Sequence, residues 1–108
     1  MFNPTDIVTL EDAKKACAEG RLHATLMMAE ELGGEWRAEN ILYLPLHASA
    51  AMDAATIDLI AAVRRGMIQV HITPTYHHAS FVPTAITIIA TTPRKDVEMV
   101  RIIEVWQP

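Results

Sequence analysis

The stretch TAITIIATTPRKDVEMVRIIEVW, residues 84–106, decides the fold of this chain. Its first part, 84–92, is rich in β-branched residues, and its last part, 97–106, is again rich in Val and Ile. Residues of these types favour β-strands. The two parts flank a polar turn at 92–96, in which Pro93 occupies a position that β-turns favour. The pattern predicts a C-terminal antiparallel β-hairpin.

Two more strands are expected before the hairpin. A short one is predicted from Ile41 to Leu46, where Pro45 lacks an amide donor and therefore places the strand at a sheet edge or at its own end. From Met67 to Thr73 apolar and polar residues alternate, as they do in a strand with one buried face. The apolar set is Ile68, Val70 and Ile72, and the polar set is Gln69, His71 and Thr73.

A helix is predicted from Thr9 to about Glu19. The Thr9 hydroxyl can accept a hydrogen bond from an amide of the first turn, and Asp12, three residues on, completes a short variant of the capping box. Glu11 and Asp12 also suit the positive end of the helix dipole. Gly20 ends the helix, because glycine readily adopts the left-handed conformation that follows a helix.

A second helix is predicted to begin near Ser49 or Asp53 and to run to Arg65, before Gly66. Apolar residues recur there at intervals of three and four, which is typical of a helix with one buried face. The positions that form or widen this face include Ile57, Leu59, Ile60, Ala61 and Val63.

The segment Leu22 to Leu32 fits two structures. Leu22 and Leu26 are spaced as in a helix, yet alternate residues from Leu22 to Met28 also fit a strand. Length and intrinsic propensity favour a helix, which Gly33-Gly34 would end.

These elements follow the order helix, helix, strand, helix and three strands. Since strands and helices do not alternate strictly, the order predicts an α+β fold rather than a parallel α/β sheet. We expect one small domain over residues 1–108, with two or three helices packed on a mainly antiparallel sheet that includes the C-terminal β-hairpin.

The chain is apolar for its size. Hydrophobic residues make up 51% of its 108 residues and charged residues 20%, and its mean hydropathy is +0.18. A small domain has a large surface relative to its volume, so apolar patches are best covered by another subunit. We therefore expect a homo-oligomer.

The sequence predicts a cytoplasmic protein without a membrane partner. Its most apolar stretches are interrupted, by Arg64 and Arg65 or by Thr91 and Thr92, before the roughly 20 residues that a membrane span needs. The first residues show no basic region followed by an apolar run, so no secretory signal is expected. Cys17 is the only cysteine, which excludes an intrachain disulfide.

Nucleic-acid binding is not expected either. It depends on Lys and Arg side chains that contact phosphates. The chain has only nine such residues and a formal net charge of −4. They are scattered, with Arg64-Arg65 and Arg94-Lys95 as the only adjacent pairs.

One segment concentrates side chains that bind ligands. Residues 73–81, TPTYHHASF, join two predicted strands and carry a tyrosine, two histidines and several hydroxyls. Such groups offer hydrogen bonds, stacking surfaces and nitrogens that titrate near neutral pH, and loops on a rigid sheet are where binding groups gather. The candidate ligand-binding residues are His71, Tyr76, His77 and His78, with His47 as a further neighbour.

The same segment also fits an ordinary hairpin loop or a subunit contact. Adjacent strand residues point to opposite faces, so His77 and His78 could bind one metal ion only across a kink. No spacing forces three or four ligands to converge, as a zinc site requires. We assign no metal, and the sequence does not identify a cofactor.

Two other groups of residues are interpreted as structural rather than functional. An acidic cluster around Gly33-Gly34 is interpreted as a solvated face. The two tryptophans, Trp36 and Trp106, are interpreted as anchors in the core or at an interface. The acidic residues are Glu30, Glu31, Glu35 and Glu39.

Three functions are compatible with these patterns. The favoured one is a non-catalytic, self-associating accessory protein that binds a small molecule, such as a nucleotide or metabolite, through the His/Tyr loop at a subunit boundary. A protein–protein interaction module of the inhibitor or immunity type is the first alternative. The second is a small enzyme with His77 or His78 as general base or metal ligand. Catalysis is not favoured, because the chain lacks the spaced motifs of common enzyme classes. The sequence also does not identify a nucleophile together with a general base that would activate it. The Ala- and Met-rich composition suggests a bacterial or bacteriophage source.

Overall fold

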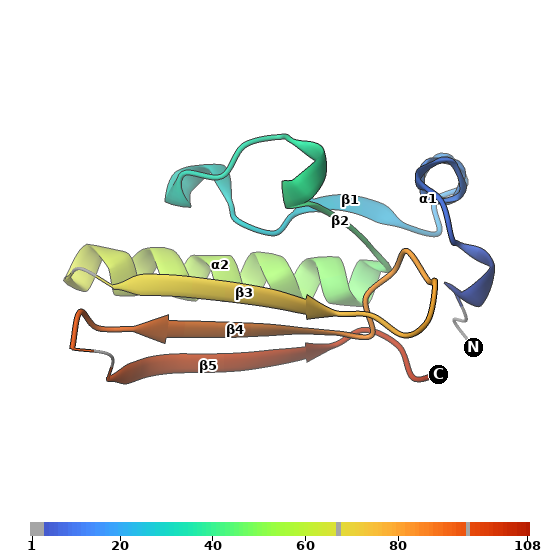
Figure 1. The fold of residues 1–108 in the computed structure, drawn as a ribbon. Coiled ribbons are helices and arrows are strands. Elements are labelled where there is room, and N and C mark those ends of the chain that lie inside the picture. Colours follow the sequence, from blue (N-terminus) through green and yellow to red (C-terminus); the bar gives the residue numbers. More distant parts are fainter. Residues whose placement is uncertain (1–3, 67, 95) are drawn as a thin grey trace.

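The computed structural model describes residues 4–66, 68–94 and 96–108. Figure 1 shows two α-helices and two sheets in this part of the chain. The elements in chain order are α1 (Leu10–Ala18), β1 (His23–Leu26), β2 (Ile41–Leu44), α2 (Leu46–Arg65), β3 (Gln69–Thr75), β4 (Ala85–Thr91) and β5 (Val97–Glu104). Short 3-10 helices lie at Pro4–Asp6, Glu30–Leu32 and Ala38–Asn40.

The larger sheet confirms the predicted α+β class and the C-terminal hairpin. Its strand order is β3-β4-β5, and both pairings are antiparallel. The register places Ile72 opposite Ile88, and Ile86 opposite Ile103. An irregularity between Ala90 and Thr91 precedes the turn into β5. The central strand β4 is therefore bonded on both sides, while β3 and β5 form the edges.

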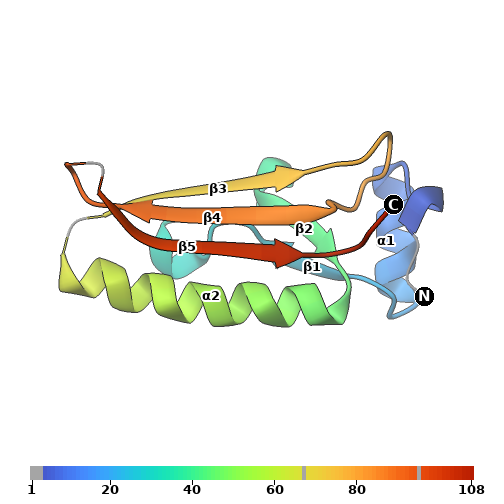
Figure 2. The ribbon, with the colours of Figure 1, turned by 90° about the horizontal axis from the view of Figure 1, so that it is seen from below.

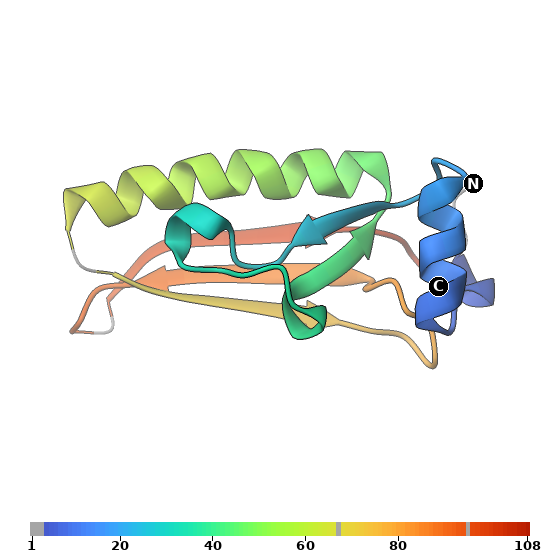
Figure 3. The same cartoon turned by 90° about the horizontal axis from the view of Figure 1, so that it is seen from above.

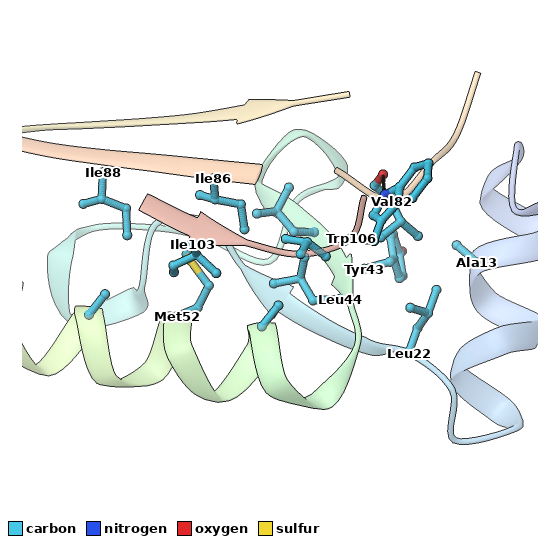
Figure 4. Packing of buried hydrophobic residues seen from close by; sticks show 14 of the residues in the cluster. Ala13, Leu22, Tyr43, Leu44, Met52, Val82, Ile86, Ile88, Ile103 and Trp106 are labelled. Carbon is cyan, nitrogen blue, oxygen red and sulfur yellow. Dashed lines mark hydrogen bonds between the residues drawn. The ribbon is translucent and has the colours of Figure 1, made fainter. Parts of the chain in front are cut away.

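Helix α2 covers one face of this sheet (Figures 1 and 2). Its buried residues recur every three or four positions, as an amphipathic helix requires. They meet the alternate buried residues of β4. Figure 4 shows Met52 of α2 beside Ile103 and close to Ile86. The buried positions are Ala48, Met52, Ala55, Leu59 and Ala62 on α2, and Ile86, Ile88 and Ala90 on β4.

Strand β3 has the alternation that the sequence predicted. Exposed positions alternate with half-buried ones along Gln69–Thr75. Val70 and Ile72 pack against the core, while His71 and Thr73 are exposed on the opposite, outer face. The predicted start at Met67 lies outside the described residues, and the strand continues to Thr75 rather than ending at Thr73.

The prediction of a helix over Leu22 to Leu32 is wrong. Residues 23–26 form β1, which pairs antiparallel with β2 so that His23 lies opposite Leu44. The only helical turn in the segment is the 3-10 turn Glu30–Leu32, which ends at Gly33 with a φ of 94°. Pairing with a distant strand outweighs the local helix propensity, because it satisfies the backbone groups and buries Leu22 fully.

Helix α1 confirms the predicted caps. The amide of Asp12 donates to the Thr9 hydroxyl at 3.0 Å, and the amide of Thr9 donates to the Asp12 carboxylate at 3.2 Å. Both halves of the capping box are therefore present. Gly20 follows the helix with a φ of 78°, the left-handed conformation that its lack of a Cβ permits.

Helix α2 begins earlier than predicted. It starts at Leu46 directly after Pro45, which takes the N-cap position in an extended conformation. Proline is tolerated at this place, because the N-cap residue donates no hydrogen bond within the helix. The predicted strand Ile41–Leu46 therefore ends earlier, at Leu44, because Leu46 belongs to the helix. Pro45 lies directly after the strand, and the strand end was one of the two places expected for it.

Helix α2 is also long and apolar enough to cross a membrane by length and composition alone. The two arginines that were expected to interrupt this stretch lie at its last two positions. The observation is weak evidence, since the core helix of a soluble protein meets the same criterion. Met52 and Leu59 of this stretch are fully buried against the sheets, although only 28% of the stretch as a whole is buried.

The packing of α2 makes a testable distinction between two leucines. Leu59 is 1% exposed and Leu46 is 68% exposed on the same helix. Leu59→Ala should lower the free energy of unfolding by about 2–5 kcal/mol, because it leaves a cavity in the core. Leu46→Ala is the matched control and should change the stability by less than about 0.5 kcal/mol. Urea denaturation of both variants measures the difference; equal losses would contradict the packing described.

The cap of α1 predicts a pH dependence. The pKa of Asp12 lies below its ordinary value of 3.8, first because the amide of Val8 donates to its carboxylate, and also because of the Thr9 hydroxyl and amide. A lowered pKa in the folded state stabilises the fold above pH 3.8, and this contribution is lost as the pH falls through the lowered value. Asp12→Ala should therefore be less stable than the wild type at pH 7, and the gap should close in acid.

Thermal denaturation between pH 7 and pH 2 tests this pH dependence. Glu11→Ala is the control, since it removes a carboxylate from the same first turn without removing the capping box. A stability gap for Asp12→Ala that stays constant into acid would show that the ionised carboxylate contributes nothing to the cap.

Candidate functional site

A pocket of about 280 Å³ lies at one end of the larger sheet. Three parts of the chain meet there: the β3–β4 loop, the segment that precedes α1, and the residues that follow β5. Figure 1 shows these parts together at the end where both termini lie. The lining includes Val8, His77, His78, Ser80, Trp106 and Gln107.

Backbone and side-chain hydrogen bonds hold the β3–β4 loop against the N-terminal segment. The amide of Phe81 donates to the Ile7 carbonyl at 2.6 Å. The buried Ser80 hydroxyl donates to the Pro4 carbonyl at 3.1 Å and accepts from the Val82 amide at 3.2 Å. These contacts fix the loop although it has no regular secondary structure.

Trp106 forms the inner wall of the pocket. It is 7% exposed, and its Nε1 donates to the Val82 carbonyl at 3.0 Å. Figure 4 shows its ring beside Val82, near Tyr43. A buried indole with its N–H satisfied is rigid, so it offers a fixed apolar surface to the pocket.

The two adjacent histidines both line this pocket because the chain kinks between them. His78 has a φ of 52°, in the left-handed region that non-glycine residues rarely adopt. The ring centroids of His77 and His78 are 3.9 Å apart, and that of His77 lies 6.0 Å from the Trp106 ring in an edge-on arrangement. In a regular strand these neighbours would point to opposite faces. The kink therefore brings three aromatic rings to one site.

The other two predicted site residues lie outside this lining. His71 is on the outer face of β3, opposite Ile89. Its Cα lies four steps along the strand from that of Thr75, at the end of β3, which is a distance of about 13 Å. Tyr76 is 47% exposed, and burial of the rest of its side chain raises the pKa of its phenol. His47 is exposed in the first turn of α2 and does not line the pocket.

Metal binding receives no geometric support in the described part of the chain. No group of three or more His, Cys, Asp or Glu side chains there is placed to hold a metal ion. His77 and His78 alone give at most two ligands, whereas a structural or catalytic zinc site takes three or four protein ligands.

A second, wider groove of about 580 Å³ lies between α2 and the segment 24–36. Trp36 lines it and is 59% exposed, so this tryptophan is not the core anchor that the sequence allowed. Its Nε1 donates to the Glu30 carboxylate at 2.5 Å. The four glutamates of the acidic cluster are solvent-exposed, as expected of a solvated face, and two of them, Glu30 and Glu31, line this groove.

The segment that walls this groove is shaped by Asn40. Its side chain accepts from the amide of Met28 at 2.8 Å and donates to the Met28 carbonyl at 2.9 Å. Gly34 passes so close to Met28 that an added Cβ would meet the Met28 carbonyl oxygen at 1.7 Å. In the sequence, the Gly33-Gly34 pair indicated a turn. It did not indicate which segment of the chain packs against Gly34.

Comparison of the chain with protein-family models, with curated proteins and with solved structures found no match.

Ser80 is the residue whose loss should loosen the pocket most. Ser80→Ala leaves the Val82 amide without its buried acceptor and the Pro4 carbonyl with the Ile7 amide alone, which should cost about 1–3 kcal/mol in the free energy of unfolding. Ser49→Ala, which removes a half-buried hydroxyl 3.0 Å from that of Thr25, is the matched control and should cost less. Hydrogen exchange of the loop amides, measured with urea denaturation, checks the claim. Unchanged exchange at residues 77–82 would show that Ser80 does not hold the loop.

Proposed function

We propose that this protein is a non-catalytic, self-associating, cytoplasmic protein that binds a small molecule in the pocket formed by His77, His78 and Trp106. The observation that carries the proposal is the meeting of three aromatic rings at a kinked loop. The His77 and His78 rings lie 3.9 Å apart, and the His77 ring lies edge-on to the Trp106 ring. Non-glycine residues adopt a positive φ mainly where surrounding contacts require it, and such residues cluster at ligand sites.

The size of the pocket limits the ligand. A volume of about 280 Å³ lies at the small end of ligand pockets, which span roughly 300–1,000 Å³. One planar ring system fits such a space, whereas a dinucleotide does not. Val8 and the Trp106 ring supply apolar surface, and the imidazole nitrogens of His77 and His78 supply donors and acceptors.

The polar groups of the pocket indicate a neutral aromatic ligand. No Lys or Arg is among the described residues that line it, and phosphate groups are usually held by such side chains or by helix N-termini. We therefore favour an aromatic metabolite of the size of a nucleobase over a nucleotide held by its phosphates.

Binding is favoured over catalysis by the hydrogen bonds of the Ser80 hydroxyl, which lines the pocket together with the histidines. The Ser80 Oγ donates to backbone carbonyls and accepts from the Val82 amide. A nucleophile instead needs its hydroxyl hydrogen-bonded to a base.

An interaction module of the inhibitor type remains the alternative, and it would use the exposed apolar residues of α2, Leu46, Ile57 and Val63.

Trp106 fluorescence provides a direct test. The chain has two tryptophans, and Trp36 lines the other groove, so Trp36→Phe leaves Trp106 as the only tryptophan. In this background, titration with adenine should quench the emission saturably, while free phosphate should not. Replacing both His77 and His78 with Ala should weaken adenine binding at least about tenfold, equivalent to about 1.4 kcal/mol.

His71→Ala is the matched control for the histidine pair. His71 is exposed on the outer face of the sheet and does not line the pocket, so its loss should leave the titration unchanged. The choice of adenine is tested against native mass spectrometry of freshly purified protein, which reports any bound small molecule by its mass. No quenching by adenine and a clean ligand-free mass would together reject small-molecule binding and favour the interaction module.

A further inference from the structure

We infer that two copies of this chain join through strand β5, edge to edge and antiparallel, so that the two three-stranded sheets form one continuous sheet. The inference rests on the self-association within the proposed function and not on its ligand. It names the interface, which the sequence could not do.

The chain exposes more surface than a compact monomer of its mass. Its accessible surface is 6775 Å², about 800 Å² more than a monomeric protein of 12.0 kDa is expected to expose. The radius of gyration is 14.3 Å, against about 13 Å for a compact chain of this length. A standard interface buries about 800 Å² of each partner. The excess surface is of the same size as the area that one subunit loses in a standard interface.

Strand β5 carries a large share of the exposed apolar side chains. Val97, Val100 and Ile102 are 62%, 47% and 65% exposed. Val100 and Ile102 lie opposite Ile89 and Thr87 of β4, on the sheet face that α2 does not cover. None of the described helices or strands lies over that face or beyond β5 (Figures 1 and 2).

The free edge of β5 fits another β5 better than any other element. An unpaired edge presents a row of backbone N–H and C=O groups that pair readily with an extended chain. A two-fold axis pairs a strand with its own copy in antiparallel register, so each strand supplies the donors and acceptors that the other lacks. A second copy also places Val100 and Ile102 beside the same residues of its partner.

The opposite edge, β3, is less suited to this role. Pro74 lies within it and has no amide to donate, and proline is one device by which edge strands avoid pairing. The outer face of β3 is also polar, with His71 and Thr73 exposed. On β5, the Arg101 side chain lies 3.5 Å from Asp58 of α2, and its Nη1 donates to the Val100 carbonyl at 3.0 Å.

Two isoleucines of nearly equal exposure make a matched test. Ile102 on β5 is 65% exposed and Ile57 on α2 is 68% exposed. In sedimentation velocity at micromolar concentration the wild type should sediment at about twice the subunit mass of 12.0 kDa. Ile102→Asp should shift it to a single subunit, whereas Ile57→Asp should remain a dimer.

Each other outcome has a distinct meaning. A monomeric wild type rejects both the interface and the self-association of the proposed function. A dimeric wild type with a dimeric Ile102→Asp rejects only the β5 interface, and so does dissociation of Ile57→Asp. Adenine binding by the pocket is measured separately and does not depend on either result.

A measurement on the wild type tests the β5 interface even if Ile102→Asp does not fold. The outward-facing amides of β5 should exchange hydrogen more slowly at high protein concentration than after dilution, whereas those of β3 should not change. Exchange in β5 that does not depend on concentration would overturn the inference even if the variant fails to fold.

Discussion

The contact between one face of α2 and the inner face of β4 is the constraint on which the rest of the structure depends. A helix of 20 residues is about 30 Å long, and strands of seven or eight residues span about 23–27 Å. The two elements therefore match in length. Small residues at Ala48, Ala55 and Ala62 let the helix approach the sheet closely, while Met52 and Leu59 fill the space between them.

Because this contact occupies only one side of α2, the helix needs further cover. Figure 3 shows β1 and β2 beside α2 on the same side of the larger sheet. The Thr25 and Ser49 hydroxyls lie 3.0 Å apart where β1 meets the helix, so even a polar pair is satisfied there. This second sheet completes the core with Leu42 and Leu44. It also explains why residues 23–26 are extended in spite of their helix propensity.

Loops and chain termini cover one end of the layered core, and the pocket lies between them. Ile7 and Trp106 pack at the end of the sheet from opposite ends of the sequence. The β3–β4 loop is bonded to both, through Phe81 and Val82. The molecule extends over 42 × 25 × 20 Å, with the pocket at one end and the β5 edge along one side. The proposed ligand pocket and the proposed β5 interface therefore lie on different surfaces, and neither proposal geometrically requires the other.

The sequence by itself determined the elements whose signals are local. The capping box of Thr9 and Asp12, the alternation from Ile68 to Thr73 and the β-branched hairpin of residues 84–106 each arise from interactions within a few residues, or from one buried face. Tertiary structure alone decided the rest. The strand at residues 23–26 exists because a partner 15 or more residues away pairs with it. His77 and His78 were recognisable as a candidate site, but Trp106 joins them only because folding brings residues nearly 30 positions apart into contact, and His71 is separated from them because a strand is straight. Local sequence patterns do not specify such distances between residues, because the distances are set when the core packs.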